Sequence, residues 1–156
     1  MSRADELKEM ASRYPTGVVV ITALGPGGPA GFTAQTFVSL SLEPPLVSFA
    51  VSSEGRSWST MREASRFAIN VLGQDQEDLA QRFATSGIDK YAGIEWAPAP
   101  GGSPWLGGTL ARLEGELVAR TQFGDHDVVV LSADHVEYGE GEPLIYHHRK
   151  FRSLEP

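Results

Sequence analysis

The stretch of residues 31–46 has the side chains best suited to holding a ligand. Between Gly31 and Ser41, small residues and hydroxyls alternate with Phe and Leu. This alternation predicts an extended segment with one face in a core and the other free to donate hydrogen bonds. The alternative interpretation is a half-buried strand whose Thr and Ser serve only strand propensity.

A second polar cluster, residues 52–58, follows the apolar residues 47–51. Ser57 could cap a helix over residues 57–64, and free N–H groups at a helix start suit a phosphate; the alternative is that Ser57 only caps. Cations that accompany hydroxyl-rich or turn segments are Arg56, Arg82, Lys90 and Arg149. Each of them could equally be a solvated surface charge.

Four histidines, at positions 126, 135, 147 and 148, lack the helical i, i+4 spacing of a metalloprotease, so no metal site is expected. His126 follows Gly-Asp at a predicted tight turn, from which a side chain could project into a cleft. His135 lies inside a predicted strand and is expected to be structural. The sequence carries no dinucleotide-binding glycine motif after a strand, no phosphate-binding loop with Gly-Lys-Ser/Thr, and no Gly-x-Ser-x-Gly elbow.

Composition predicts one cytoplasmic domain over residues 1–156. Hydrophobic residues make up 41% and charged residues 21% of the chain, as in ordinary globular proteins. The net charge of −7 argues against nucleic-acid and anionic-membrane partners, so an anionic cofactor would have to be held by local groups. The chain has no cysteine, and its polar first residues carry no secretory signal.

The elements that would position these side chains are mostly strands. Helical patterns cover residues 3–14, 57–64 and 75–84, and strand patterns cover residues 17–24, 31–41, 46–52, 66–72, 110–121, 127–138 and 144–147. The β-branched residues 17–24 predict a strand buried on both faces. Pro and Gly make residues 25–29 a turn and residues 97–104 a loop. The pattern predicts a mainly β, antiparallel barrel with Greek-key character and a few short helices.

Several motifs occur in a fixed order along nearly the whole chain. They include Tyr14-Pro15-Thr16-Gly17, the stretch of residues 31–45, Arg56-Ser57-Trp58, Gly124-Asp125-His126 and Pro143-Leu144-Ile145-Tyr146. In this order they resemble the flavin reductase-like family. The sequence is most similar to the small reductase components of two-component flavin-dependent monooxygenases.

The resemblance implies an FMN-binding split β-barrel and an NAD(P)H:flavin oxidoreductase that supplies reduced flavin to a partner monooxygenase. The flavin would be FMN or FAD, the hydride donor NADH or NADPH, and the protein a homodimer. His126 would lie near the nicotinamide as the catalytic residue. The cofactor-binding residues would be Thr33, Ala34, Gln35, Thr36 and Ser39 at the flavin ring, Ser52, Ser53, Arg56, Ser57, Trp58, Arg82 and Phe83 at the phosphate, and Tyr146, His147, His148 and Arg149 at the nicotinamide nucleotide.

Two other functions remain open on the sequence alone. The same residues would serve a flavin-binding or carrier module without turnover. They would also suit an oxidase or a deazaflavin-using reductase on a related split barrel, although Gly124-Asp125-His126 and Ser41-Leu42-Glu43-Pro44-Pro45 fit the flavin reductases better.

Overall fold

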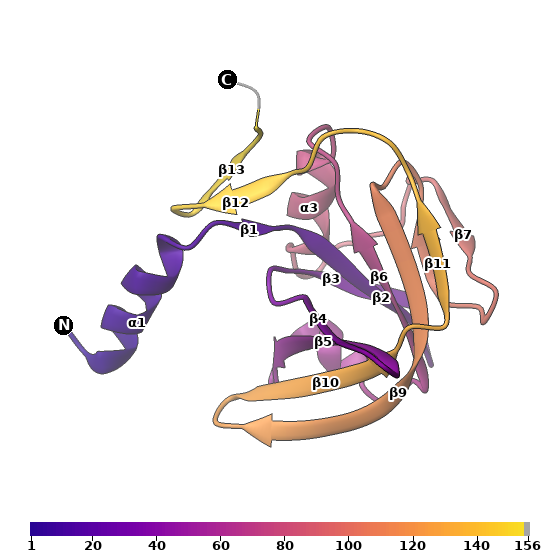
Figure 1. Cartoon of the computed structure of the whole chain (residues 1–156), viewed down its shortest axis with the longest axis horizontal. Helices are drawn as coiled ribbons and strands as arrows, with labels where there is room; N and C mark the ends of the chain where they lie inside the picture. Colours follow the sequence, from indigo (N-terminus) through magenta and orange to yellow (C-terminus); the bar gives the residue numbers. More distant parts are fainter. Residues whose placement is uncertain (155–156) are drawn as a thin grey trace.

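The computed structural model describes residues 1–154, and its largest element is a curved antiparallel sheet of eight strands (Figure 1). The strand order is β3-β2-β6-β9-β10-β5-β4, and β11 is added beside β9. The strands are β2 (Val19–Gly25), β3 (Gly28–Ala34), β4 (Val38–Leu42), β5 (Pro45–Ser52), β6 (Arg66–Val71), β9 (Ala111–Phe123), β10 (His126–Ser132) and β11 (His135–Tyr138). The mainly β, antiparallel architecture predicted from the sequence is confirmed.

Strand β9 belongs to both halves of the barrel. Residues 111–116 pair with β6, whereas residues from Leu117 to Phe123 pair with β10. Gly115 lies at the change of partner, where a Cβ atom would collide with the backbone carbonyl of Ser132. A glycine is therefore needed for β9 to bend past the end of β10, and this bend curls the sheet.

Strand β2 runs through the middle of the core. All residues from Val18 to Ala23 are buried, which confirms the predicted strand with two buried faces. One face packs in a cluster that contains Phe49 and Trp58, whose rings meet edge to face with centroids 6.0 Å apart. The other face packs against Phe83 beneath a helix. The barrel is thus filled on both sides of one strand.

Three short helices flank the barrel: α1 (Arg3–Ser12), α2 (Arg56–Met61) and α3 (Glu77–Phe83). Helix α1 opens with a capping box, in which Ser2 Oγ accepts from the N–H of Asp5 at 3.1 Å. It buries no residue and extends away from the barrel, at the left of Figure 1. Its link to the body is a small sheet of β1 (Thr16–Gly17), β12 (Ile145–His147) and β13 (Lys150–Arg152).

The predicted loop over residues 97–104 is wrong, because a hairpin forms there. Strands β7 (Trp96–Pro98) and β8 (Pro104–Leu106) pair antiparallel. The buried carboxylate of Glu114 accepts from the N–H groups of Gly101 and Ser103, at 2.6 and 2.9 Å. A distant side chain therefore satisfies the turn donors that a Pro- and Gly-rich stretch would otherwise leave to water.

Three other boundaries differ from the sequence-based prediction. The predicted strand over residues 127–138 is broken between β10 and β11, because Ala133 and Asp134 donate to Pro45 and Glu114 instead of continuing the ladder. The stretch of residues 31–41 is divided between β3 and β4. Helix α2 begins at Arg56 with Gly55 as its N-cap, so the capping role predicted for Ser57 is wrong.

Candidate functional site

A cavity of about 400 Å³ opens where β3, β5, α2 and the end of α3 meet. Cavities of this volume commonly hold cofactors and other small molecules. It brings together ten of the residues that the sequence assigned to a site: Thr33, Ala34, Gln35, Thr36, Ser52, Arg56, Ser57, Trp58, Phe83 and His126.

The segment between β3 and β4 forms one wall of this cavity. Thr33 Oγ1 donates to the carbonyl of Ala80 at 2.6 Å, which ties β3 to α3. Thr36 Oγ1 donates to the carbonyl of Ala50 at 2.7 Å and accepts from its N–H at 3.0 Å. Both hydroxyl hydrogens are thus already engaged, so these threonines fix the shape of the wall.

Asp127 lies beneath the turn of residues 52–55 and holds this turn and α2 in place through two hydrogen bonds. Its side chain is buried and accepts from Trp58 Nε1 at 2.8 Å and from Ser53 Oγ at 2.7 Å. These two donors, with Trp58 the stronger, hold the pKa of Asp127 below its ordinary value. Trp58 is therefore fixed in the core next to the cavity, with 1% of the residue exposed, while Ser53 does not line the cavity.

Two cations, Arg56 and Lys90, line the cavity beside Ser57. Arg56 is exposed, and its guanidinium makes no hydrogen bond or ion pair with any residue between 1 and 154. Lys90 is half-buried, and its ammonium donates to Ser57 Oγ at 2.8 Å. Burial lowers the pKa of Lys90. This side of the cavity is positively charged although the chain as a whole is acidic.

His126 lies at the edge of the cavity, at the start of β10. The preceding Gly124 has a φ of 59°, which a tight turn requires at that position. Nδ1 of His126 and Oδ1 of Asp125 are 2.8 Å apart, and the histidine side chain is 48% exposed. The hydrogen bond and the charge of His126 lower the pKa of Asp125. The imidazole is thus accessible to a ligand and oriented by its neighbour.

The other predicted site residues lie outside the cavity lining. Arg82 Nη1 donates to the carbonyl of Ala92 at 2.7 Å, and Ser39 is exposed on β4. Tyr146 lines a neighbouring hollow of about 380 Å³ that shares Thr33 and Gln35 with the cavity. The remaining three, His147, His148 and Arg149, are at the β12–β13 turn.

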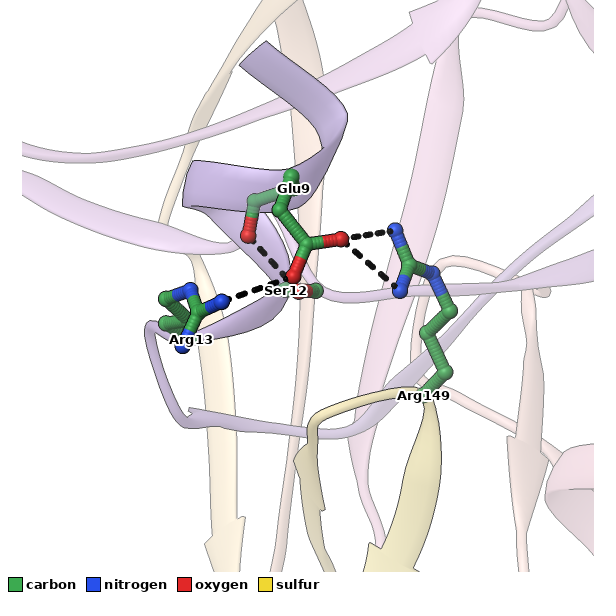
Figure 2. Close-up of polar contacts among 4 residues, drawn as sticks. All are labelled: Glu9, Ser12, Arg13 and Arg149. Carbon is green, nitrogen blue, oxygen red and sulfur yellow. Dashed lines mark hydrogen bonds and ion pairs between the residues drawn. The ribbon is translucent and has the colours of Figure 1, made fainter. Parts of the chain in front are cut away.

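The β12–β13 turn is held against α1. Arg149 donates to Glu9 Oε2 at 3.4 Å through both Nη atoms, and Arg13 donates to the other carboxylate oxygen at 2.9 Å (Figure 2). The N–H of His148 donates to the carbonyl of Ser12 at 2.7 Å. Glu9 thereby balances the positive charge of Arg149 in this conformation.

Seven lining residues were missed by the sequence-based assignment: Phe32, Ala50, Val51, Gly55, Ala84, Ser86 and Lys90. Most are apolar or small, and in a sequence such residues are indistinguishable from core or turn positions. Lys90 carried a signal as one of four candidate cations near turns, but nothing in the sequence placed it beside Ser57.

The lining fits a flavin mononucleotide. Phe32 is partly exposed and offers apolar surface to a planar ring system, while Phe83 and Trp58 are buried in the core next to the cavity. Arg56 and Lys90 offer positive charge to a phosphate. Among residues 1–154 no group of His, Cys, Asp and Glu is arranged to hold a metal ion. Nor does that part of the chain contain a helix long and apolar enough to cross a membrane.

The fold is a split barrel, and its cavity is lined by small, hydroxyl and aromatic residues and by two cations. Residues 10–155 match the model of the flavin reductase like domain. The reductase subunit HsaB of a flavin-dependent monooxygenase from Rhodococcus jostii is 37% identical over 150 residues, which is 96% of this chain and 77% of that protein. An NADH:FMN oxidoreductase from Rhodococcus erythropolis is 36% identical over 159 residues, which is 98% of this chain and 83% of that protein.

A solved structure supports the same assignment. An NADH:FAD oxidoreductase from Streptomyces globisporus, in complex with NAD and FAD fragments, superimposes with a TM-score of 0.91 at 29% identity, covering 99% of this chain and 94% of that one. The chain belongs to the flavin reductase-like family. The split-barrel fold and the family resemblance inferred from the sequence are both confirmed.

Proposed function

We propose that this protein is an NADH:flavin oxidoreductase that reduces FMN and supplies the reduced flavin to a separate monooxygenase. The observation that carries the proposal is the cavity, in which aromatic side chains and two cations meet. The names of its relatives support it, since one is the reductase subunit of a flavin-dependent monooxygenase and another an NADH:FMN oxidoreductase.

The cavity suits a reaction that needs orientation more than acid–base groups. A flavin held in the cavity would accept a hydride from a nicotinamide, and the protein would have to orient the two rings toward each other. Trp58 and Phe83 are buried next to the cavity and make its inner side part of the packed core, and the engaged hydroxyls of Thr33 and Thr36 keep the wall rigid. His126, which lines the edge of the cavity, would contact a nicotinamide that enters through the open side.

We assign nine of the ten lining residues predicted from the sequence, all except His126, to flavin, with the ring against residues 33–36 and the phosphate near Ser52, Arg56 and Ser57. Tyr146 suits the nicotinamide nucleotide, because its hollow adjoins the cavity through Thr33 and Gln35. His147, His148 and Arg149 would border the same nucleotide. Three predicted residues, Ser39, Ser53 and Arg82, do not line the cavity. Their side chains would contact a flavin only in a conformation different from the one described above.

Steady-state oxidation of NADH with added FMN tests the proposed function. Turnover should be supported by FMN and by riboflavin, and NADPH should serve as the control donor. Protein that binds flavin but turns over with neither nicotinamide would overturn the proposal and favour a flavin carrier.

We further propose that the protein is a homodimer and that its reduced flavin reaches the monooxygenase by diffusion. Exposed apolar residues support self-association, since α1 buries none of its residues and the edge strand β4 exposes Val38, Leu40 and Leu42. Residues 1–156 would act as one domain. A cytoplasmic location stays a prediction, and it is consistent with a nicotinamide substrate, which is a cytoplasmic metabolite.

A further inference from the structure

The ammonium of Lys90 is fully engaged by neutral groups. A lysine has three N–H donors, and those of Lys90 go to the carbonyls of Gly31 and Phe83 and to Oγ of Ser57, at 3.0, 2.8 and 2.8 Å. Between residues 1 and 154 it forms no ion pair with a carboxylate. A half-buried charge without a counter-ion is costly, so its position calls for an anion nearby.

The backbone is shaped to hold this ammonium. A Cβ atom at position 31 would lie 2.9 Å from both the carbonyl oxygen of Ile21 and the ring of Phe83. Only glycine lets β3 approach α3 closely enough for the carbonyls of Gly31 and Phe83 to converge on one nitrogen. Lys90 therefore occupies a built position and is not a freely moving surface cation.

The bond from Lys90 decides what Ser57 can do. Oγ of Ser57 accepts from the ammonium, so its own hydrogen is left to donate. Within residues 1–154 that hydrogen has no acceptor, and Ser57 lines the cavity. A hydroxyl polarised by a cation behind it is a strong donor toward a negatively charged group.

We propose that Lys90 is a positioning residue that acts through Ser57 to select flavins bearing a phosphate. This inference rests on the proposed function, because it concerns the flavin of that same site. Lys90 contributes positive charge and fixes the orientation of the Ser57 hydroxyl, whereas Ser57 donates the hydrogen bond to the phosphate. The two side chains form one unit, so removing either should remove the same preference.

Equilibrium titration of the purified protein with FMN and with riboflavin, followed by flavin fluorescence, tests this inference without catalysis. Lys90→Met and Ser57→Ala should each weaken FMN binding by about ten- to a hundredfold, as expected for a lost bond to a charged group, and leave riboflavin binding within about threefold. The double variant should be no weaker than the worse single variant, since the pair acts as a unit. Lys150→Met, which changes an exposed lysine on β13, is the matched control and should bind both flavins normally.

Equal losses for FMN and riboflavin, or fully additive losses in the double variant, would overturn the inference. If Lys90→Met does not fold, Ser57→Ala alone still decides, because it keeps the lysine and removes only the donor. Wild-type protein that prefers FMN yet oxidises no nicotinamide would overturn the proposed function while supporting this inference. Wild-type protein that reduces FMN and riboflavin but binds the two equally would support the proposed function and overturn this inference.

Discussion

The indole Nε1 of Trp58 donates a hydrogen bond to Oδ2 of Asp127 over 2.8 Å, and the two residues are 1% and 3% exposed. Ser53 Oγ donates to the other carboxylate oxygen over 2.7 Å. The N–H of Ser53 donates in turn to the carbonyl of Asp125. One buried carboxylate therefore ties the start of β10 to the turn of residues 52–55 and to α2, which together carry much of the cavity.

Trp58→Phe should lower the free energy of unfolding by about 1.5–3 kcal/mol, because it removes a hydrogen bond to a buried charge. Asp127→Asn is the matched variant: its amide can accept from Trp58 and donate to Ser53, so the loss should be smaller. Urea denaturation measures both. A Trp58→Phe protein within about 0.5 kcal/mol of wild type would show that this contact is not stabilising.

The stability contributed by Asp127 should depend on pH in one direction only. Its pKa is lower in the folded protein than in the unfolded chain, where an aspartate has a pKa of about 3.9. The ionised carboxylate therefore stabilises the fold above that pH, and the contribution is lost as the pH falls through the folded pKa.

Comparing wild type with Asp127→Asn across pH tests this sign. The difference in free energy of unfolding should stay constant between about pH 5 and 8 and shrink below about pH 4. A difference that grows in acid would mean that the carboxylate is destabilised by its surroundings, contrary to the two donors that face it.

Local sequence patterns were sufficient for elements whose partners are also apolar strands. The β-branched run of β2 predicts a strand buried on both faces, and the structure has one. They were insufficient where a remote polar group decides the conformation. The β7–β8 hairpin depends on Glu114, which no propensity of residues 97–104 can reveal.

The candidate site shows the same limit. The family resemblance and the donor-rich segments predict ten of the lining residues, but they do not assign Lys90 to the site. Its partners Gly31 and Ser57 are 59 and 33 positions away in the chain, and Phe83 offers only a backbone carbonyl. Because backbone acceptors leave no mark on residue type, only the fold can show where that charge is held.

Arg82→Ala should change the affinities for FMN and riboflavin equally. The guanidinium of Arg82 donates to the carbonyl of Ala92, and Arg82 lies outside the cavity lining, so its loss should remove no contact with the phosphate. Fluorescence titration with both flavins measures the effect. A loss confined to FMN, of about 1.5–3 kcal/mol, would instead show that Arg82 bonds the phosphate directly.

Sedimentation should give the mass of a homodimer at assay concentrations. Leu42→Glu on the edge strand β4 should shift the protein toward monomer, because Leu42 is 82% exposed and a charge there opposes apolar contact. Tyr138→Glu is the matched control, since Tyr138 is 87% exposed on β11, away from that edge. A wild-type monomer with full activity would contradict the proposed dimer.

His126→Ala should lower kcat/KM for the nicotinamide by about ten- to a hundredfold, or about 1.4–2.7 kcal/mol. The loss should be modest because hydride transfer needs no proton from this residue. Flavin affinity and the melting temperature should stay near wild type, since the side chain is 48% exposed and its only hydrogen-bond partner within residues 1–154 is Asp125.

Asp125→Asn supplies the comparison for His126, because an amide at that position retains an oxygen for Nδ1 but removes the charge that now orients the imidazole. Its effect on kcat/KM should lie between those of wild type and His126→Ala. A histidine that only shapes the turn would give the opposite pattern, with a lower melting temperature and unchanged kinetics per folded molecule. Thermal unfolding measured beside steady-state kinetics on the same samples separates the two, and the second pattern would remove His126 from the site.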